Sequence, residues 1–284
     1  MTSRAMNLAA ATWAALFFAA CVITCGLMGC SATHLILTTQ SSPVNYNLTG
    51  NWVLTVSPGS GATVPIAIFL TENSGSVSGL AVGPAATDLL VYPDGCVGSP
   101  IGPFTNVALT GTVDSEGNLK LATAANAVPS ATMTATVSGS SLSNGAFAIK
   151  GAASCAPQGS MTGIEYAIVN GTYSGTVTSQ ATGQSFTVTA TLQQSPLPNA
   201  EGLLALTGTA TVSGYPCIPS GATAISASFV GAGFFTDLSN SPSGTLGWTG
   251  SLSPDGKTLG INYGFSPANS ACKQDEGTGT LTLQ

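Results

Sequence analysis

The chain has 284 residues, of which 44% are hydrophobic and only 6% are charged, against about 25% charged residues in a typical soluble protein. Its 35 glycines and 16 prolines stay below the combined share of about 25–30% that is typical of disordered chains, so we expect a folded protein. The formal net charge is −6 and the few lysines are dispersed, which excludes a nucleic-acid groove because such a groove needs concentrated positive charge.

The N-terminal element is typical of an export signal. Arg4 is followed by an uncharged run over residues 8–29 that is rich in Ala, Leu, Phe, Val and Ile. The run ends in Leu27-Met28-Gly29-Cys30, which resembles the lipobox of bacterial lipoproteins. The resemblance implies that residues 1–29 are a signal peptide and that Cys30, the first residue after cleavage, carries lipid. An uncleaved transmembrane helix is the alternative, because the run is long enough to span a bilayer.

Lipid on Cys30 would hold the protein on a membrane of the bacterial cell envelope. Ser31 occupies the next position, and in Gram-negative lipoproteins a residue other than Asp there is similar to the outer-membrane sorting signal. We therefore expect an outer-membrane protein, on either the periplasmic or the cell-surface face. Residues 30–45 are expected to form a lipidated tether, which includes His34, the single histidine of the sequence.

Alternation of apolar and polar residues dominates the rest of the chain and predicts β-strands. In the runs Phe186–Leu192 and Leu206–Val212 the intervening residues are all Thr, and Gly208 takes one inward position. Similar runs occur at Met133–Val137, Val107–Val113 and Leu259–Phe265. Turn signals separate the runs, at Ser115–Asn118, Ser143–Gly145 and Ser253–Gly256. We expect an all-β, mostly antiparallel fold.

The mature chain is predicted to contain two copies of one domain, as an internal repeat indicates. Leu48–Thr55 matches Val169–Thr176, which lies 121 positions later, and both runs place Gly-x-aromatic at the start of a first strand. The same offset carries Cys96 onto Cys217, and the segment after Cys155 resembles the one after Cys272. The sequence thus predicts one β domain over residues 46–166 and a second over residues 167–284. Chance similarity between strands of low complexity is the alternative.

The cysteines predict two disulfides. Cys21 and Cys25 leave with the signal peptide and Cys30 is lipidated, so four cysteines remain in an oxidising compartment, and four cysteines allow three pairings. The duplication favours Cys96–Cys155 and Cys217–Cys272, because each domain then contains its own bond. A zinc site is the alternative, but the CxxC spacing of such sites is absent. We expect no metal and no cofactor.

Each copy has room for about seven or eight short strands, arranged as a closed barrel or as a two-sheet sandwich. Gly50-Asn51-Trp52 resembles the opening of lipocalin-like and avidin-like barrels, and Gly244–Thr249 is similar to an avidin strand. Biotin binding is not expected, because avidin-like proteins surround biotin with several tryptophans, whereas only Trp52 and Trp248 follow the leader. We expect Trp52 and Tyr173 to plug the core of their domains.

The residues of most catalytic sites are missing. His34 lies in the tether, so Ser-His-Asp and Cys-His mechanisms lack their base. A carboxylate-dependent hydrolase needs only two acids, and the pairs Asp114/Glu116 and Asp275/Glu276 are the candidates. We expect turn and solubility roles for both pairs. The sequence therefore predicts no catalytic residue.

These features predict a membrane-anchored envelope lipoprotein with a non-enzymatic binding or structural role. A surface of hydroxyls rather than charges suits an envelope glycan or a neighbouring envelope protein as the partner. A lipocalin-like carrier of a small apolar ligand is the alternative, and a carboxylate-dependent hydrolase is a third hypothesis. An interior cavity of roughly several hundred Å³ would favour the carrier, and two acids facing each other across a groove would favour the hydrolase.

Overall fold

The computed structural model describes residues 46–58, 63–82, 107–124, 130–150, 158–218, 221–236, 239–241, 244–268 and 270–284. Throughout these segments the regular elements are β-strands, which confirms the predicted all-β fold. They contain no helix that is long and apolar enough to cross a membrane. The predicted signal peptide and tether, including Cys30, lie outside the described residues.

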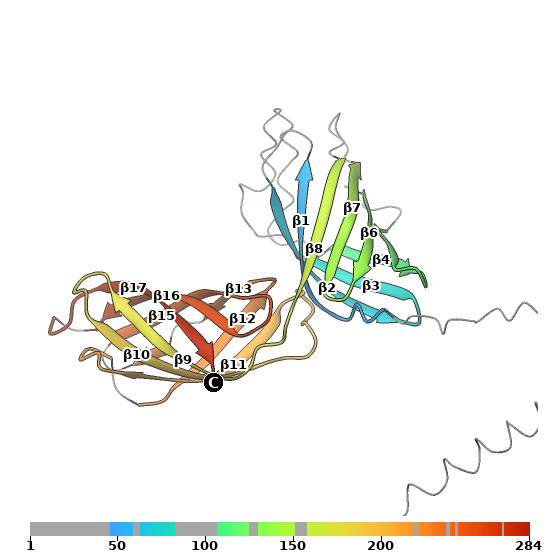
Figure 1. The fold of residues 1–284 in the computed structure, drawn as a ribbon. Coiled ribbons are helices and arrows are strands. Elements are labelled where there is room, and N and C mark those ends of the chain that lie inside the picture. Colours follow the sequence, from blue (N-terminus) through green and yellow to red (C-terminus); the bar gives the residue numbers. More distant parts are fainter. Residues whose placement is uncertain are drawn as a thin grey trace, which may run out of the picture. The chain divides into compact units, whose positions relative to one another are not determined.

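The first eight strands form a closed antiparallel barrel, in which each strand pairs with the next and the eighth pairs with the first (Figure 1). All of them lie within the predicted first domain. Their bounds are β1 (Gly50–Pro58), β2 (Val64–Asn73), β3 (Ser76–Val82), β4 (Val107–Val113), β5 (Asn118–Thr123), β6 (Ser130–Ser138), β7 (Ser141–Lys150) and β8 (Gln158–Tyr166).

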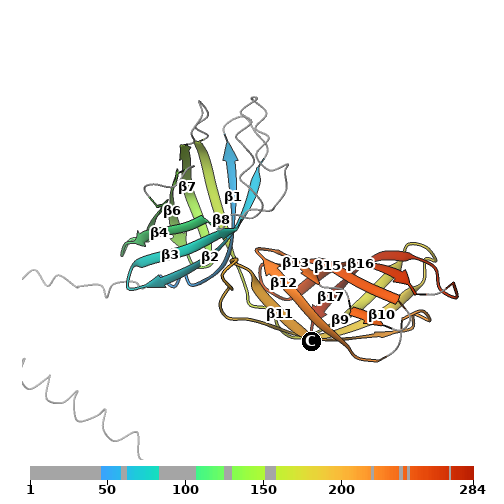
Figure 2. The ribbon, with the colours of Figure 1, turned by 180° about the vertical axis from the view of Figure 1, so that it is seen from behind.

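The remaining nine strands form one antiparallel sheet, ordered β13-β12-β11-β10-β9-β17-β16-β15-β14. A further pairing joins β13, at one end of this order, to β15, the strand next to the other end, so the sheet curls round on itself; we call it the second barrel (Figure 2). The bounds are β9 (Asn170–Ser179), β10 (Ser185–Gln194), β11 (Leu204–Ser213), β12 (Thr223–Val230), β13 (Gly233–Thr236), β14 (Ser239–Ser241), β15 (Gly244–Leu252), β16 (Thr258–Pro267) and β17 (Asp275–Leu283).

The two barrels are built alike from their first strands. β1 pairs with β2 and β8, and β9 pairs in the same way with β10 and β17. Trp52 and Tyr173, the aromatic residues of the repeat, are both fully buried, which confirms their expected core role. The polar atom of each side chain donates a hydrogen bond to a backbone oxygen: the Trp52 indole N–H donates to Leu48 at 3.0 Å, and the Tyr173 hydroxyl donates to Gly256 at 2.7 Å.

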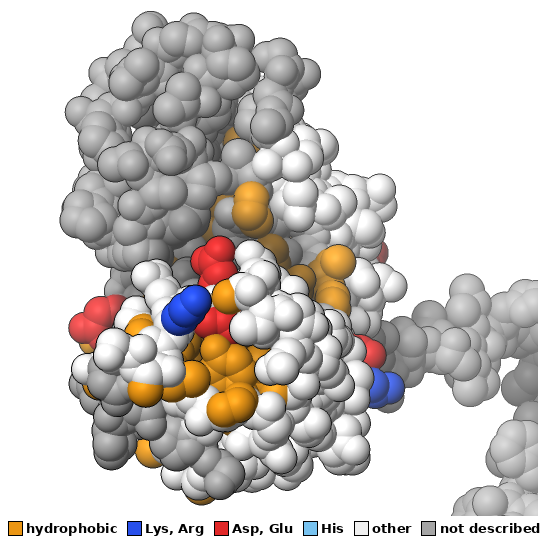
Figure 3. Space-filling model, turned by 90° about the vertical axis from the view of Figure 1, so that its left-hand side faces the viewer, with side chains coloured by type: hydrophobic (Ala, Val, Ile, Leu, Met, Phe, Trp, Pro, Cys, Tyr) orange, Lys and Arg blue, Asp and Glu red, His pale blue; other side chains and the backbone are white. Residues whose placement is uncertain are grey.

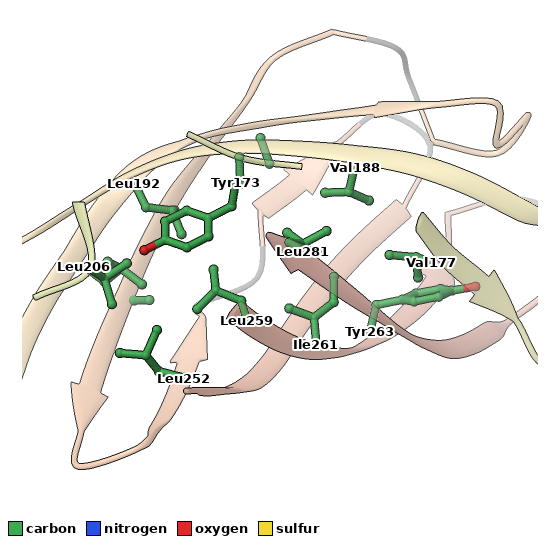
Figure 4. Packing of buried hydrophobic residues seen from close by; sticks show 14 of the residues in the cluster. Tyr173, Val177, Val188, Leu192, Leu206, Leu252, Leu259, Ile261, Tyr263 and Leu281 are labelled. Atoms are coloured by element: carbon green, nitrogen blue, oxygen red, sulfur yellow. The ribbon is translucent and has the colours of Figure 1, made fainter. Parts of the chain in front are cut away.

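Inward-facing side chains fill the centre of the second barrel. Alternate residues of β9, β10, β16 and β17 are buried, as the period-two pattern predicts. Figure 4 shows side chains from opposite walls pointing toward one another, and the labelled ones are Tyr173, Val177, Val188, Leu192, Leu206, Leu252, Leu259, Ile261, Tyr263 and Leu281. The core of the first barrel forms a cluster of its own around Trp52 and Leu54.

One predicted turn is wrong. Residues 143–145 lie inside β7, and there the register of the pairing with β6 and of the pairing with β8 is shifted. Asn144 has a φ of 50°, a left-handed conformation that Asn tolerates, so this Asn-Gly pair forms a β-bulge rather than a hairpin loop. The chain turns instead at Gly139 and Ser140. The predicted turns near Glu116 and Asp255 are confirmed.

Candidate functional site

The predicted site residues fall into two groups. Cys30, Cys96 and Cys155 lie outside the described residues. Cys217 and Cys272 form the disulfide that the repeat predicts, with their Cα atoms 5.8 Å apart. This bond joins the connection between β11 and β12 to the connection between β16 and β17, and so it marks one end of the second barrel.

A buried carboxylate lies at the same end. Asp275 is the first residue of β17 and is only 4% exposed. The register places it opposite Phe265 of β16 and places Gly277 opposite Ser179, the last residue of β9. A Cβ atom at Gly277 would lie 2.6 Å from the ring of Tyr263, so the glycine leaves the space that this ring occupies. The absence of a side chain at Gly277 thus lets the Tyr263 hydroxyl reach Asp275.

Five hydrogen bonds converge on the Asp275 carboxylate. Its Oδ2 accepts from the hydroxyls of Tyr215 and Tyr263, each at 2.6 Å. Its Oδ1 accepts from the Ser179 hydroxyl at 2.9 Å and from the backbone N–H groups of Glu276 at 2.9 Å and Ala181 at 3.2 Å. The donors lie at or just after the end of β9, just after β11, within β16 and at the start of β17, so one carboxylate links four parts of the barrel.

The hydrogen bonds decide the ionisation of this cluster. Burial raises the pKa of Asp275, but hydrogen bonds from Tyr215, Tyr263 and Ser179 outweigh burial and leave the pKa below its ordinary value. Burial, together with the adjacent carboxylate, holds the pKa of Tyr215 and of Tyr263 well above that of a free phenol. At neutral pH the cluster is therefore a carboxylate anion surrounded by neutral donors.

Aromatic rings pack around the carboxylate. The ring of Tyr215 lies 5.0 Å from that of Phe186 and 6.3 Å from that of Phe265, and Tyr263 lies 5.4 Å from Phe186 and 6.2 Å from Trp248. Tilted and edge-to-face contacts of this kind add stability beyond the burial of area. Figure 3 shows hydrophobic side chains that reach the surface at this end of the barrel, with polar and a few charged side chains beside them.

The geometry gives Asp275 a structural role. A general base needs a free lone pair within reach of a substrate proton, whereas both oxygens of this carboxylate already accept hydrogen bonds from the protein. The prediction of a turn and solubility role is thus wrong for Asp275, because this residue continues the inward face of β17. Glu276 is exposed, as a solubility role requires, but it too lies in β17 and not in a turn. No sequence motif marks Tyr215 or Tyr263, and only strand alternation could have indicated that Tyr263 points inward.

The other acidic residues do not join Asp275. Asp114 organises the hairpin between β4 and β5, where its Oδ1 accepts from the backbone of Glu116 and Asn118 at 2.9 Å each. Asp255 accepts in the same way from Ser253 and from the backbone of Lys257. Among the described residues Asp275 is the sole buried carboxylate, and no group of three metal-ligating side chains is found there.

A hollow opens on the outer face of the second barrel. It has a volume of about 460 Å³ and lies over β15, β16 and β17. Gly260 forms part of its floor, and a Cβ atom there would meet the hydroxyl of Ser251 at 3.2 Å and the backbone oxygen of Ser251 at 3.9 Å. All of its lining residues are uncharged, namely Thr249, Gly250, Ser251, Gly260, Ile261, Asn262, Thr278, Gly279 and Thr280.

Comparison with known proteins does not assign a family. No family model and no curated protein matches the sequence. The structure is similar to that of kievitone hydratase from Nectria haematococca, with 9% sequence identity and a TM-score of 0.25, over 87% of this chain and 95% of the other. A similarity this low assigns neither fold nor activity, so the function has to be argued from the residues themselves.

Proposed function

We propose that this protein is a lipid-anchored lipoprotein of the bacterial envelope, with a non-enzymatic binding role. The lipobox-like segment that ends at Cys30 supports the anchor. The engaged oxygens of Asp275 argue against a carboxylate mechanism, since the sole buried carboxylate of the described residues serves the fold. The barrel architecture is compatible with a lipocalin-like carrier, but large side chains occupy the interior of the second barrel (Figure 4).

The observation that carries the binding role is the hollow over β15–β17. Hydroxyl groups of Thr and Ser and the amide of Asn262 surround a floor that contains Gly260, and no charged side chain lines it. Hydroxyls and amides can each donate and accept hydrogen bonds, which matches the alternating donors and acceptors of a neutral, hydroxyl-rich ligand. We therefore propose a neutral envelope glycan as the ligand.

The binding test uses a substitution at the floor of the hollow, whose new side chain fills it. The full-length lipidated protein in detergent is applied to immobilised neutral glucan, mannan and galactan, and binding to at least one of them is expected. Gly260→Tyr should abolish this binding, because its side chain enters the hollow. Gly264→Tyr is the matched control, since Gly264 also lies on β16 but outside the hollow and with open space around it. Absence of binding by the unmodified protein, or equal loss in both variants, would contradict the proposal.

The anchor is tested separately. Cells that express the chain are labelled with radioactive palmitate, and the label should appear in the protein and in the membrane fraction. Cys30→Ala should remove the label and leave residues 1–29 uncleaved, because cleavage follows lipidation of this cysteine, whereas Cys25→Ala should change neither. If the unmodified chain stayed in the membrane without label and retained residues 1–29, the result would instead support an uncleaved helix.

A further inference from the structure

The disulfide end of the second barrel contains two links between the same two segments. Cys217 belongs to the connection that leads from β11 to β12, and Cys272 lies three residues before β17. Two residues before Cys217, the hydroxyl of Tyr215 donates to Asp275 at 2.6 Å. One link is covalent and reducible and the other is a hydrogen bond, and both hold the β11–β12 connection against the start of β17.

The ring of Tyr215 covers an apolar layer. It lies within 6.5 Å of three other rings, those of Phe186, Tyr263 and Phe265. These three are at most 3% exposed, whereas Tyr215 itself is partly exposed. Tyr215 is thus the outermost of these four rings, and its displacement would expose Phe186 and Phe265, the two phenylalanines against which it packs.

The remaining contacts of Asp275 do not depend on the disulfide. Without Tyr215 the carboxylate still accepts from Tyr263, from Ser179 and from two backbone N–H groups. These donors lie in or directly after strands β9, β16 and β17, which are paired with one another along their lengths. Release of the β11–β12 connection would therefore leave the barrel wall in place.

We infer that the Cys217–Cys272 disulfide is a redox-sensitive latch, which holds Tyr215 over the aromatic layer and opens this end of the second barrel when it is reduced. The reductant is a dithiol. Its two electrons and two protons break the S–S bond and form two thiols, and the dithiol becomes a disulfide. In the opened state the rings of Phe186 and Phe265, which are at most 3% exposed in the closed barrel, become accessible to solvent.

The test compares the oxidised and the reduced full-length protein. It uses the variant Cys96→Ser/Cys155→Ser, so that Cys217 and Cys272 form the bond under study. Hydrogen exchange followed by mass spectrometry should show at least a tenfold faster exchange of residues 214–218 after reduction. The peptide that covers β10 (residues 185–194) should be unchanged. Hydroxyl-radical oxidation of Phe186 and Phe265 should increase in the same sample.

Two further variants distinguish a local latch from a disulfide that stabilises the whole barrel. Cys217→Ser/Cys272→Ser should show the open pattern without any reductant, and Tyr215→Ala should raise ring oxidation while the disulfide stays intact. Unchanged exchange of residues 214–218 upon reduction would overturn the inference. Faster hydrogen exchange of the β10 peptide upon reduction would overturn it too, because the bond would then stabilise the whole barrel and not only a local cover. Neither outcome bears on glycan binding at the outer hollow.

Discussion

At the scale of single residues, the Asp275 carboxylate organises one end of the second barrel through five hydrogen bonds. Strand alternation indicates its burial, because every second residue after it, namely Gly277, Gly279 and Leu281, lies on the same side of β17. The adjacent Glu276 and the preceding cysteine instead suggested a solvated loop. The donors could not be predicted, because Tyr215 and Ser179 are brought to this carboxylate by the barrel and are distant from it in sequence.

Replacement of Asp275 by Asn tests this role. The amide keeps the size of the side chain but loses the charge, and it presents an N–H group to donors that need an acceptor. Hydrogen bonds to a buried charged group contribute about 1.5–3 kcal/mol each, so we expect Asp275→Asn to lower the free energy of unfolding by about 2–4 kcal/mol. Glu276→Gln is the matched control, because the side chain of Glu276 is exposed. The urea unfolding of this control variant should barely change. Equal effects in the two variants would contradict a structural role.

The same carboxylate predicts a pH dependence. Its pKa in the folded protein lies below the ordinary value of 3.8, despite burial, because of the Tyr215, Tyr263 and Ser179 hydrogen bonds. The ionised form therefore favours folding: this stabilisation is complete above about pH 5 and is lost as the pH falls through the lowered pKa. The difference in urea midpoint between the natural chain and Asp275→Asn should shrink toward about pH 2. A difference that stays constant would show that charge is not its cause.

At the scale of secondary structure, strand alternation predicted most of the strands, but close approaches between strands were not visible in it. Val107–Val113 coincides with β4, and the runs at Phe186 and Leu206 lie within β10 and β11. Gly208 takes the inward position expected of it, yet its role is steric: a Cβ atom there would lie 2.0 Å from the backbone oxygen of Thr191 on β10. The sequence pattern predicts which face of the sheet a residue lies on, whereas how closely two strands approach at one position depends on the whole sheet.

Gly208→Ala should therefore destabilise the second barrel. The methyl group can be accommodated only by moving backbone, for which we expect a loss of about 1–3 kcal/mol. Gly264→Ala is the control within the same barrel, because a Cβ atom there meets nothing within 4 Å. Its effect should be neutral or stabilising by up to about 1 kcal/mol, since alanine restricts the unfolded chain. Thermal unfolding followed by circular dichroism compares the two, and similar losses would show that both effects arise from strand propensity.

At the scale of the whole molecule, the duplication has the greatest predictive value. It led from a short Gly-x-aromatic match to two barrels with equivalent first strands, and it selected Cys217–Cys272 from three pairings. Its physical basis is that each copy must bury its own aromatic residue, Trp52 or Tyr173, and close its own sheet. Composition and alternation alone left barrel and sandwich open, because both bury one face of every strand.

The same reasoning predicts a second bond, Cys96–Cys155, under oxidising conditions. In the second barrel, β9 to β13 count as the first five strands and β15 to β17 as the sixth to eighth. Cys217 then follows the third strand and Cys272 follows the seventh. Cys96 lies between β3 and β4 and Cys155 between β7 and β8, which are the corresponding connections. A bond that closes a loop of this length stabilises by about 4 kcal/mol in the chain-entropy model, so the small first barrel would gain substantially from it.

Peptide mapping without reductant measures the pairing directly. A peptide pair that contains Cys96 and Cys155 should be recovered, and it should disappear in the variant Cys96→Ser/Cys155→Ser, while the Cys217–Cys272 pair remains. In that variant the first barrel should unfold at a lower urea concentration, which hydrogen exchange of the β1 peptide around Trp52 measures. The hydrogen exchange of the β10 peptide should be unaffected. A Cys96–Cys217 crosslink would refute the idea that each copy closes its own bond, because a link between the copies makes their stabilities interdependent.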